Sequence, residues 1–237
     1  MKDRGTILKR TWKIIKRIFL ILFISQFIYI ILLKWMDPPV TITQLQNWFS
    51  GNGLKRDYVD YDEMSKNIKL AVIASEDQLF PDHGGFDWKS MEKAWKYNQK
   101  KPGRIRIQKG GSTISQQVAK NVFLWQGRSY FRKALEAYFT KMIEWIWGKK
   151  RILEVYLNVI ETGKGVFGVE AAAQAYFRKP ASKLTRQEAA MIAAGLPNPK
   201  VFKLKPVHPH IITRSGQISR QMSYLEKDVD VREIIDY

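Results

Sequence analysis

The chain has 237 residues, of which 45% are hydrophobic and 13% aromatic, and it carries a formal net charge of +18. This length accommodates one sizeable catalytic domain plus an anchor but not two full enzyme domains, and the hydrophobic content excludes a disordered chain. Because the sequence contains no cysteine, disulfides, thiolate catalysis and cysteine-ligated metals are excluded as well.

The N-terminus predicts a membrane anchor. Residues 1–17 contain seven lysines and arginines against one acid, so the positive-inside rule predicts a basic cytoplasmic tail. Residues 18–36 are apolar apart from Ser25, Gln26 and Lys34, and their length suits one transmembrane helix. No small-x-small cleavage site follows, which favours an anchor over a cleaved signal peptide. The rest of the chain is therefore expected on the outer face of the membrane.

The exported part of the chain remains strongly basic. An anchor would hold it within a Debye length of the bilayer, where anionic head groups or a phosphate-bearing lipid are its natural partners. The charge therefore does not require nucleic acid as a partner, and a solvated cationic surface explains many of the individual lysines equally well.

The remaining sequence divides into a juxtamembrane connector over 37–57 and a catalytic domain over 58–237. Prolines and glycines bound the connector, which contains one short amphipathic piece. The hydrophobic period of the domain is mostly helical, with little strand pattern, and predicts helices over 61–77, 88–99, 113–124, 130–147, 152–160, 169–177, 185–196 and 211–227. Segment 100–111, rich in glycine and cations, predicts a loop that is either a gate or simply flexible.

Glu76 and Asp77 end a small apolar run abruptly. Burial and a neighbouring carboxylate both raise the pKa of a glutamate, which can then act as a general base on a hydroxyl group. A solvated helix-end pair is the alternative. The residues that follow, including Phe80, His83 and Asp87, favour a functional site.

The next helix begins at Ser112 or Thr113, either of which can cap it and direct its first amides toward an anion. Thr113, Gln116 and Lys120 share one face at helical spacing and offer hydroxyl, amide and ammonium donors. Such donors suit a diphosphate and sugar hydroxyls, although a polar helix surface has the same composition.

Glu136 lies one helical turn from Arg132 and Lys133. This spacing also describes an exposed ion pair of small energetic value, and composition alone does not decide between that and a functional role. The Ser90-x-x-Lys93 pattern matches a penicillin-binding transpeptidase tetrad by chance, because no Lys-Thr-Gly partner follows. No phosphate-binding glycine motif is present, so no nucleotide cofactor is expected.

Together these residues resemble one family, the peptidoglycan glycosyltransferases, and within it the monofunctional biosynthetic form. The resemblance covers roughly residues 58–199 in five ordered blocks. They are Glu76-Asp77-x-x-Phe80-x-x-His83-x-Gly85-x-Asp87, Gly111-Ser112-Thr113-Ile114-x-Gln116-Gln117-x-x-Lys120-Asn121, Arg132-Lys133-x-x-Glu136, Lys149-x-x-Ile152-Leu153-Glu154-x-Tyr156-Leu157-Asn158, and a last block from Gly168 to Ala190. Arg178 replaces a glycine that often stands in the last block, which puts a local turn in doubt.

The resemblance implies a mainly α, lysozyme-like catalytic domain with a membrane-proximal jaw subdomain. It also implies a location in the bacterial inner membrane. The expected reaction elongates glycan strands from lipid II, with inversion to a β-1,4 bond, release of undecaprenyl diphosphate and no transpeptidase activity. Cell-division or transpeptidase proteins are the expected protein partners.

The resemblance also implies roles for individual residues. Glu76 would be the general base on the acceptor 4-hydroxyl, and Glu136 would assist the leaving group directly or by holding a divalent cation, Mg or Mn. The residues expected to bind substrate are Asp77, His83, Ser112, Thr113, Gln116, Gln117, Lys120, Asn121, Arg128, Arg132 and Lys133. Of these, Lys120 and Arg128 would hold the donor diphosphate, with Ser112 and Gln117 nearby.

Two other functions are consistent with parts of the sequence. A membrane-anchored lytic transglycosylase or muramidase would share the lysozyme-like fold, but it would place a protonated acid against the leaving oxygen. A non-catalytic scaffold for wall synthesis would need only the anchor and a binding surface. The second block and the basic loop favour the polymerase over the hydrolase.

Overall fold

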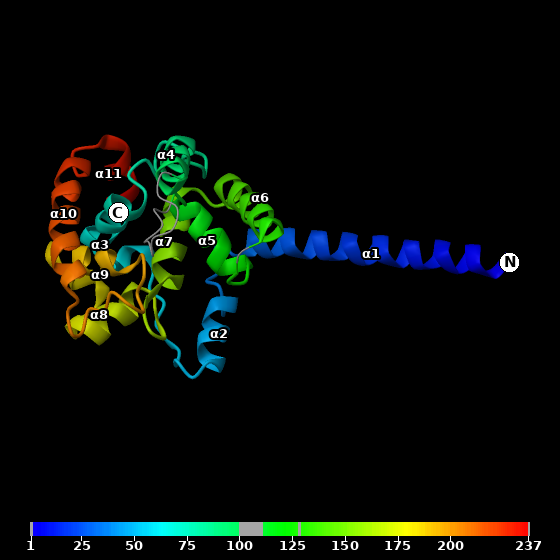
Figure 1. Ribbon diagram of the computed structural model, residues 1–237, viewed down its shortest axis with the longest axis horizontal. Helices are drawn as coiled ribbons and strands as arrows, with labels where there is room; N and C mark the ends of the chain where they lie inside the picture. Colours follow the sequence, from blue (N-terminus) through cyan, green and yellow to red (C-terminus); the bar gives the residue numbers. More distant parts are fainter. Residues whose placement is uncertain (1, 100–110, 128, 237) are drawn as a thin grey trace. The chain divides into compact units, whose positions relative to one another are not determined.

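The computed structural model describes residues 2–99, 111–127 and 129–236, with the backbone alone at residues 2–7 and 98. Figure 1 shows their helices and strands. Arg128 and almost all of the predicted 100–111 loop lie outside the described residues. The chain separates into two compact units, residues 1–37 and 38–237.

The first unit consists of helix α1 (Lys2–Leu32). Its stretch Leu8–Leu32 is long and apolar enough to cross a membrane. The helix expected over 18–36 is therefore longer at its start, where it includes the basic residues, and it ends at Leu32 before a turn. The apolar side chains of this stretch are largely exposed, as those of a helix in lipid are.

The second unit is mainly helical, which confirms the predicted fold class. Its larger elements are α2 (Ile42–Phe49), α3 (Lys66–Glu76), α4 (Trp88–Gln99), α5 (Ile114–Phe123), α6 (Tyr130–Ile146), α7 (Lys149–Val159), α8 (Val169–Phe177), α9 (Arg186–Gly195), α10 (Pro209–Leu225) and α11 (Val229–Ile235). Short 3-10 turns are η1 (Tyr61–Glu63) and η2 (Ala181–Lys183). Each predicted helix is present, with its ends displaced by a few residues.

A small sheet was not predicted. Its strands are β1 (Lys55–Arg56), β2 (Glu161–Gly163) and β3 (Val166–Phe167), in the order β1-β3-β2. β1 is parallel to β3 and β2 is antiparallel to it. Strands of two or three residues are too short to show an alternating pattern in the sequence.

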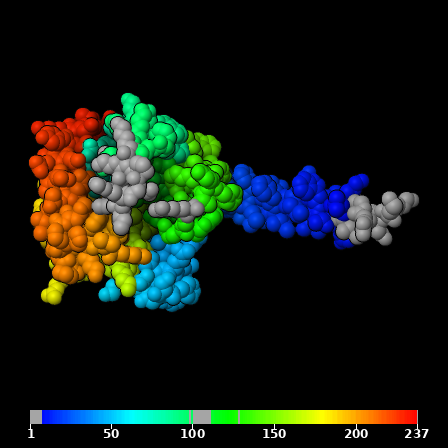
Figure 2. All heavy atoms as spheres, viewed as in Figure 1, coloured from blue at the N-terminus to red at the C-terminus, as the bar shows by residue number. Residues whose placement is uncertain are grey.

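Segment 38–57, expected to be a connector, is part of the second unit. Thr41 caps α2 through a reciprocal capping box with Gln44. β1 then pairs with β3, so that Lys55 lies opposite Val166. In the space-filling view this segment lies against the rest of the unit (Figure 2). The folded domain therefore begins near residue 38, some twenty residues before the expected boundary.

Helix α3 is the centre of the core. Ser65 caps its first turn, and every residue from Ile68 to Ala74 is buried. It packs mainly against α9 and α10, and also against α11. Figures 1 and 2 show α10 and α11 forming one side of the unit. Because the helix is held on so many sides, its last residue, Glu76, has a fixed position.

The turn after α8, which Arg178 put in doubt, is present in the structure. Arg178 ends this helix with φ 58, in the left-handed conformation that glycine adopts at helix ends without cost. Arg178 therefore holds a backbone conformation that is strained for a residue with a side chain.

Lys69 is a buried lysine in the middle of this core. It is fully buried, and its ammonium group lies 3.7 Å from the centre of the Tyr61 ring. Among the described residues Lys69 Nζ has no hydrogen-bond partner. Burial lowers the pKa of Lys69 from 10.5 to about 8, although Asp62 and Glu154 raise it. The contact with Tyr61 compensates only part of this desolvation.

Replacing Lys69 with methionine should stabilise the fold by about 1 kcal/mol at pH 7, because the variant buries no charge. The melting temperature should then rise by about 2–4 °C. Between about pH 8 and 10 the unfolded wild-type chain binds a proton that the folded chain has lost, so the wild type gains stability and the difference should shrink.

Thermal unfolding followed by circular dichroism from pH 7 to 10 measures this difference. Lys66→Met on the same helix is the control, because the Lys66 side chain is 65% exposed and pairs with Asp236 at the surface. A Lys69 variant less stable than the wild type at pH 7 would contradict the argument.

Candidate active site

Asp77 joins the end of α3 to the start of α5. Its carboxylate accepts a hydrogen bond from the backbone N–H of Ile114 at 3.0 Å and contacts His83 Nε2 at 2.9 Å. The Gly85 N–H donates to His83 Nδ1, so Nε2 is the nitrogen that donates to Asp77. Asp77 is 6% exposed. Asp77 and His83, both expected to bind substrate, thus fix the geometry of the site from within.

Gly85 allows the first block to approach α6. Its φ is 93, and a Cβ there would meet Thr140 Cγ2 at 2.7 Å. Its carbonyl accepts a hydrogen bond from the Thr113 hydroxyl at 2.7 Å. The glycine is therefore required both by its backbone conformation and by the close packing around it.

Thr113 and Gln116 form the capping box of α5. Each side chain accepts a hydrogen bond from the backbone N–H of the other. Thr113 is 2% exposed and Gln116 is 1% exposed. The predicted cap at Thr113 is confirmed. The polar atoms of this pair are used within the protein, whereas Ser112 beside them is exposed.

Glu76 lies beside α5 and is held by Gln117. The Gln117 amide donates to Glu76 Oε2 at 2.9 Å, and the Gln117 carbonyl oxygen accepts from the Tyr156 hydroxyl at 3.4 Å. Tyr156 is fully buried on α7. This chain of contacts directs the amide nitrogen of Gln117 toward the carboxylate and orients Glu76.

The environment of Glu76 makes it a stronger proton acceptor than an exposed glutamate, because its pKa is raised. Burial raises the pKa of Glu76, whereas hydrogen bonds from Gln117 and Ser75 lower it. Arg214 on α10 also lowers this pKa, and the carboxylate of Asp77 raises it. The balance is upward, as predicted, and the main cause is desolvation.

Three cavities adjoin around α5 and share walls. The large cavity, of about 820 Å³, is lined by Glu76, Gln117, Lys120, Asn121, α2 and the segment after α9. The acidic cavity, about 460 Å³, contains Glu76, Asp77, Asp87 and Lys93, and the basic cavity, about 550 Å³, contains Lys120, Arg132, Lys133 and Glu136. Glu76 lines the first two, and Gln117 and Lys120 line both the large and the basic cavity.

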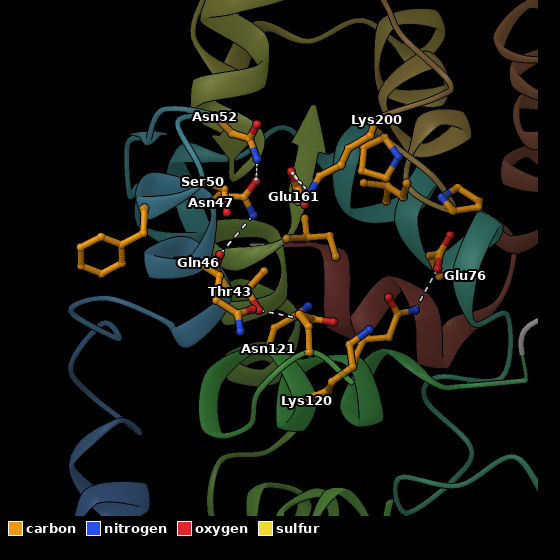
Figure 3. A pocket seen from close by; sticks show the side chains of 17 residues that line it. Thr43, Gln46, Asn47, Ser50, Asn52, Glu76, Lys120, Asn121, Glu161 and Lys200 are labelled. Carbon is orange, nitrogen blue, oxygen red and sulfur yellow. Dashed lines mark hydrogen bonds and ion pairs between the residues drawn. The ribbon is translucent and has the colours of Figure 1, made fainter. Parts of the chain in front are cut away.

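Lys120 connects the two candidate acids electrostatically. Its ammonium group is largely buried, and burial is the main reason why the pKa of Lys120 is lowered. The carboxylates of Glu136 and Glu76 raise this pKa. The cations of Arg132 and Lys133 lower it further. Figure 3 shows its side chain extending from α5 into the large cavity. Glu76, Lys120 and Glu136 therefore belong to one groove.

The buried carboxylate of Glu136 contacts two cations, of which Arg132 is buried and Lys133 is exposed. Arg132 donates to it at 2.8 Å, and Lys133 contacts its other oxygen. The Glu136 side chain is 3% exposed and that of Arg132 is 11% exposed. The exposed ion pair that the sequence left open is therefore excluded for Arg132 and Glu136, whereas the Lys133 side chain is 46% exposed. The buried pair of Arg132 and Glu136 has a substantial desolvation cost, so a functional role is favoured.

The surroundings of Glu136 do not fit a divalent cation. Both of its oxygens already contact cations, and three positive groups surround this single carboxylate. Magnesium prefers several oxygen ligands in octahedral geometry. Within the described ranges no group of three or more acidic or histidine side chains could hold a metal. We therefore derive no step through the Mg or Mn ion that the sequence led us to expect.

Several residues of the groove were not predicted. Gln126 donates to the Thr43 hydroxyl at 2.7 Å and to Asn121 Oδ1 at 3.3 Å, which links α2 to the end of α5. Glu161 and Lys200 line the large cavity as well. The polar residues of α2 were assigned to a connector. Their high density of amides and hydroxyls was the one indication that the sequence offered.

Comparison with known proteins gives the same assignment. A family model described as Transglycosylase matches residues 42–223. Proteins named biosynthetic peptidoglycan transglycosylase, from Escherichia coli strains K12 and O139:H28 among others, are 56% identical to this chain over 185 residues. The aligned region covers 77% of this chain and 75% of each relative.

Replacing Glu76 with glutamine should stabilise the fold at pH 7 by roughly 1–2 kcal/mol. The folded wild type has a raised pKa at Glu76, so its ionised form is disfavoured above the usual pKa of 4.5. Below pH 4 the carboxyl is protonated in both states and the difference should vanish. Melting temperatures from pH 3.5 to 8 measure it.

Glu92→Gln is the matched control for this experiment. Glu92 lies on the surface of α4, where its side chain is 61% exposed and pairs with Lys96. That variant should show no gain at neutral pH. Equal behaviour of the two variants would show that burial of Glu76 carries no energetic cost.

Proposed function

The chain belongs to the transglycosylase family, and from that membership we propose how its groove works. It is a peptidoglycan glycosyltransferase with a lysozyme-like helical domain, and it polymerises glycan strands from lipid II. One observation carries the assignment of roles: a half-buried carboxylate and a cluster of cations line one groove and are connected through Gln117 and Lys120.

The charges of the cavities distinguish a donor side from an acceptor side. The basic cavity carries three cations and one carboxylate, which suits a diphosphate. The large cavity carries two carboxylates and two ammonium groups and is otherwise lined by amides, hydroxyls and apolar side chains. This balance suits an uncharged saccharide, so we place the acceptor sugar there.

Glu76 is the proposed general base. In the proposed step the acceptor 4-hydroxyl attacks the anomeric carbon of the donor, and Glu76 takes the hydroxyl proton. The bond from that carbon to the diphosphate oxygen breaks, and undecaprenyl diphosphate leaves with the electron pair. Attack opposite to the leaving group inverts the anomeric centre to a β-1,4 bond.

The leaving diphosphate is stabilised by the basic cavity. Lys120, Arg132 and Lys133 place positive charge where negative charge develops, and Ser112 adds a hydroxyl donor at its edge. Glu136 positions Arg132 and Lys133 through its two contacts. Arg128 is proposed as a further cation for this group, on the family resemblance alone.

We also propose the cellular setting. Helix α1 anchors the chain in the bacterial inner membrane by a single span, with the basic residues of its first turns on the cytoplasmic side and the catalytic unit on the outer face. Transpeptidases and cell-division proteins are the proposed partners, because strands must be cross-linked after they are made.

A lytic transglycosylase or muramidase fits this groove less well. A hydrolase needs an acid that protonates the leaving oxygen and, in an inverting enzyme, space for a water on the opposite face of the sugar. Glu136 is instead held by Arg132 and Lys133, in surroundings that suit an anionic leaving group. A non-catalytic scaffold would have no use for the oriented base.

Glu76→Gln should reduce polymerisation of labelled lipid II by about 10²–10⁴-fold, because the amide cannot accept the hydroxyl proton. Products resolved on a gel measure chain formation by the full-length protein in detergent. The variant should still bind lipid II. Glu92→Gln is the control and should polymerise at the wild-type rate. Unchanged chain formation by the Glu76 variant would refute the assignment of the base, and release of soluble sugar from finished wall would indicate a hydrolase.

Lys120→Met should weaken binding of a phosphoglycolipid donor mimic, moenomycin, by at least roughly tenfold, because a charge-assisted hydrogen bond to its phosphate is lost. Fluorescence anisotropy of a labelled derivative measures the affinity. Lys96→Met, on exposed α4, is the control. Equal affinity of both variants would place the phosphate elsewhere.

A further inference from the structure

Glu161 is a second carboxylate in the large cavity, on a different element from Glu76. It begins β2, whereas Glu76 ends α3. Figure 3 shows Glu161 beside Lys200 at the rim of the cavity, with Glu76 and Lys120 on other walls. The five sequence blocks include neither Glu161 nor Lys200, and the step described above uses neither.

The Glu161–Lys200 pair is loose. The Glu161 side chain is 14% exposed and that of Lys200 is 50% exposed, and Lys200 Nζ lies 3.5 Å from Glu161 Oε1. A charge-assisted hydrogen bond is normally 2.7–2.9 Å long. In the part of the chain that the structure describes, Glu161 Oε1 has no hydrogen-bond partner. Both groups therefore retain capacity for a ligand.

The surroundings of the Glu161 carboxyl act on its pKa in both directions. Polar groups of Asn47 and Gly165 close to it, together with Lys200, lower its pKa. Burial has the larger and opposite effect and raises the pKa of Glu161. A donor from a ligand would stabilise the ionised form, so substrate binding at this carboxyl is favourable.

The walls around the pair resemble a carbohydrate site in their chemistry. Side-chain amides and hydroxyls come from Thr43, Gln46, Asn47, Ser50, Asn52, Asn121 and Gln126, and apolar surface comes from Phe49, Leu196, Pro197 and Pro199. Amides and carboxylates hydrogen-bond to sugar hydroxyls, and apolar side chains cover the faces of the ring. A diphosphate would meet two carboxylates here and is therefore disfavoured.

We propose that Glu161 and Lys200 are positioning residues for the acceptor saccharide. Glu161 accepts a hydrogen bond from a hydroxyl or acetamido N–H of that sugar, and Lys200 moves from the carboxylate to donate to a sugar oxygen. Together they hold the reactive hydroxyl toward Glu76. The inference rests on the proposed function, because it names the acceptor of that reaction.

A purely structural ion pair would have different geometry. Lys179 and Glu188 are such a pair: they lie 2.8 Å apart, and Glu188 also caps α9 through Thr185. Glu161 caps no helix, and its cation is more exposed and more distant. Glu188→Gln is therefore the matched control, because it removes an ion pair with lysine while glutamine keeps the cap.

The first experiment measures binding without turnover. The soluble disaccharide of N-acetylglucosamine and N-acetylmuramic acid is titrated into the full-length protein in detergent and followed by ligand-observed NMR. Glu161→Gln should weaken binding about tenfold or more, since a hydrogen bond to a charged group is lost. Glu188→Gln should bind as the wild type does. Equal affinity of the Glu161 variant and the wild type would overturn the proposal.

The second experiment separates positioning from folding. With a preformed lipid-linked tetrasaccharide as saturating donor and lipid II varied, Glu161→Gln should raise KM about tenfold and leave kcat within roughly twofold. The exchange Glu161→Lys with Lys200→Glu restores an ion pair but misplaces the acceptor oxygen, so it should not restore KM. Full restoration by the exchange would show a structural pair and overturn the proposal.

The two hypotheses fail in different ways. If the wild-type protein binds the disaccharide through Glu161 but makes no chains from lipid II, the proposed polymerase function fails and the saccharide site stands. If the wild type makes chains and the Glu161 variant has unchanged KM and affinity, the saccharide site fails alone.

Discussion

The site depends on the carboxylate of Asp77. It accepts from the Ile114 N–H and from His83, and so fastens the start of α5 to the end of α3. A carboxylate at a helix N-terminus is stabilised by the unpaired amides there and by the helix dipole. Together with the hydrogen bond from Gln117 to Glu76, this group joins the helix that ends in Glu76 to the helix that carries Gln117 and Lys120. The groove exists because these two helices are joined at that point.

Placing the Glu76 carboxylate at this junction costs free energy of solvation, and other residues of the fold compensate part of that cost. Its carboxylate is desolvated beside a second carboxylate, which disfavours the charged form. The Gln117 amide, directed by the buried Tyr156, restores part of the lost solvation without neutralising the base. Structural residues such as Tyr156 therefore act on the chemistry indirectly, through the orientation of an amide.

The sequence predicted those features of the structure that depend on the periodicity and spacing of nearby residues. These patterns placed the helices and grouped Glu76, Lys120 and Glu136 in order, and the structure places these three residues in one groove. They did not reveal that Thr113 and Gln116 bond to each other, because a shared helix face does not say which donors are already used. They also missed the contribution of α2, β2 and Lys200, since contacts between residues 43 and 126, or 161 and 200, depend on tertiary packing.

The contrast between the cavities explains how one groove can hold two similar substrates in different roles. Both substrates carry sugars and a diphosphate, so shape alone discriminates poorly between them. The basic cavity offers three cations near one carboxylate, whereas the large cavity balances two of each. Placing the donor diphosphate in the large cavity would bring it against Glu76 and Glu161, and like charges oppose that arrangement. The same carboxylates that receive the acceptor therefore also help to exclude the donor in the wrong orientation.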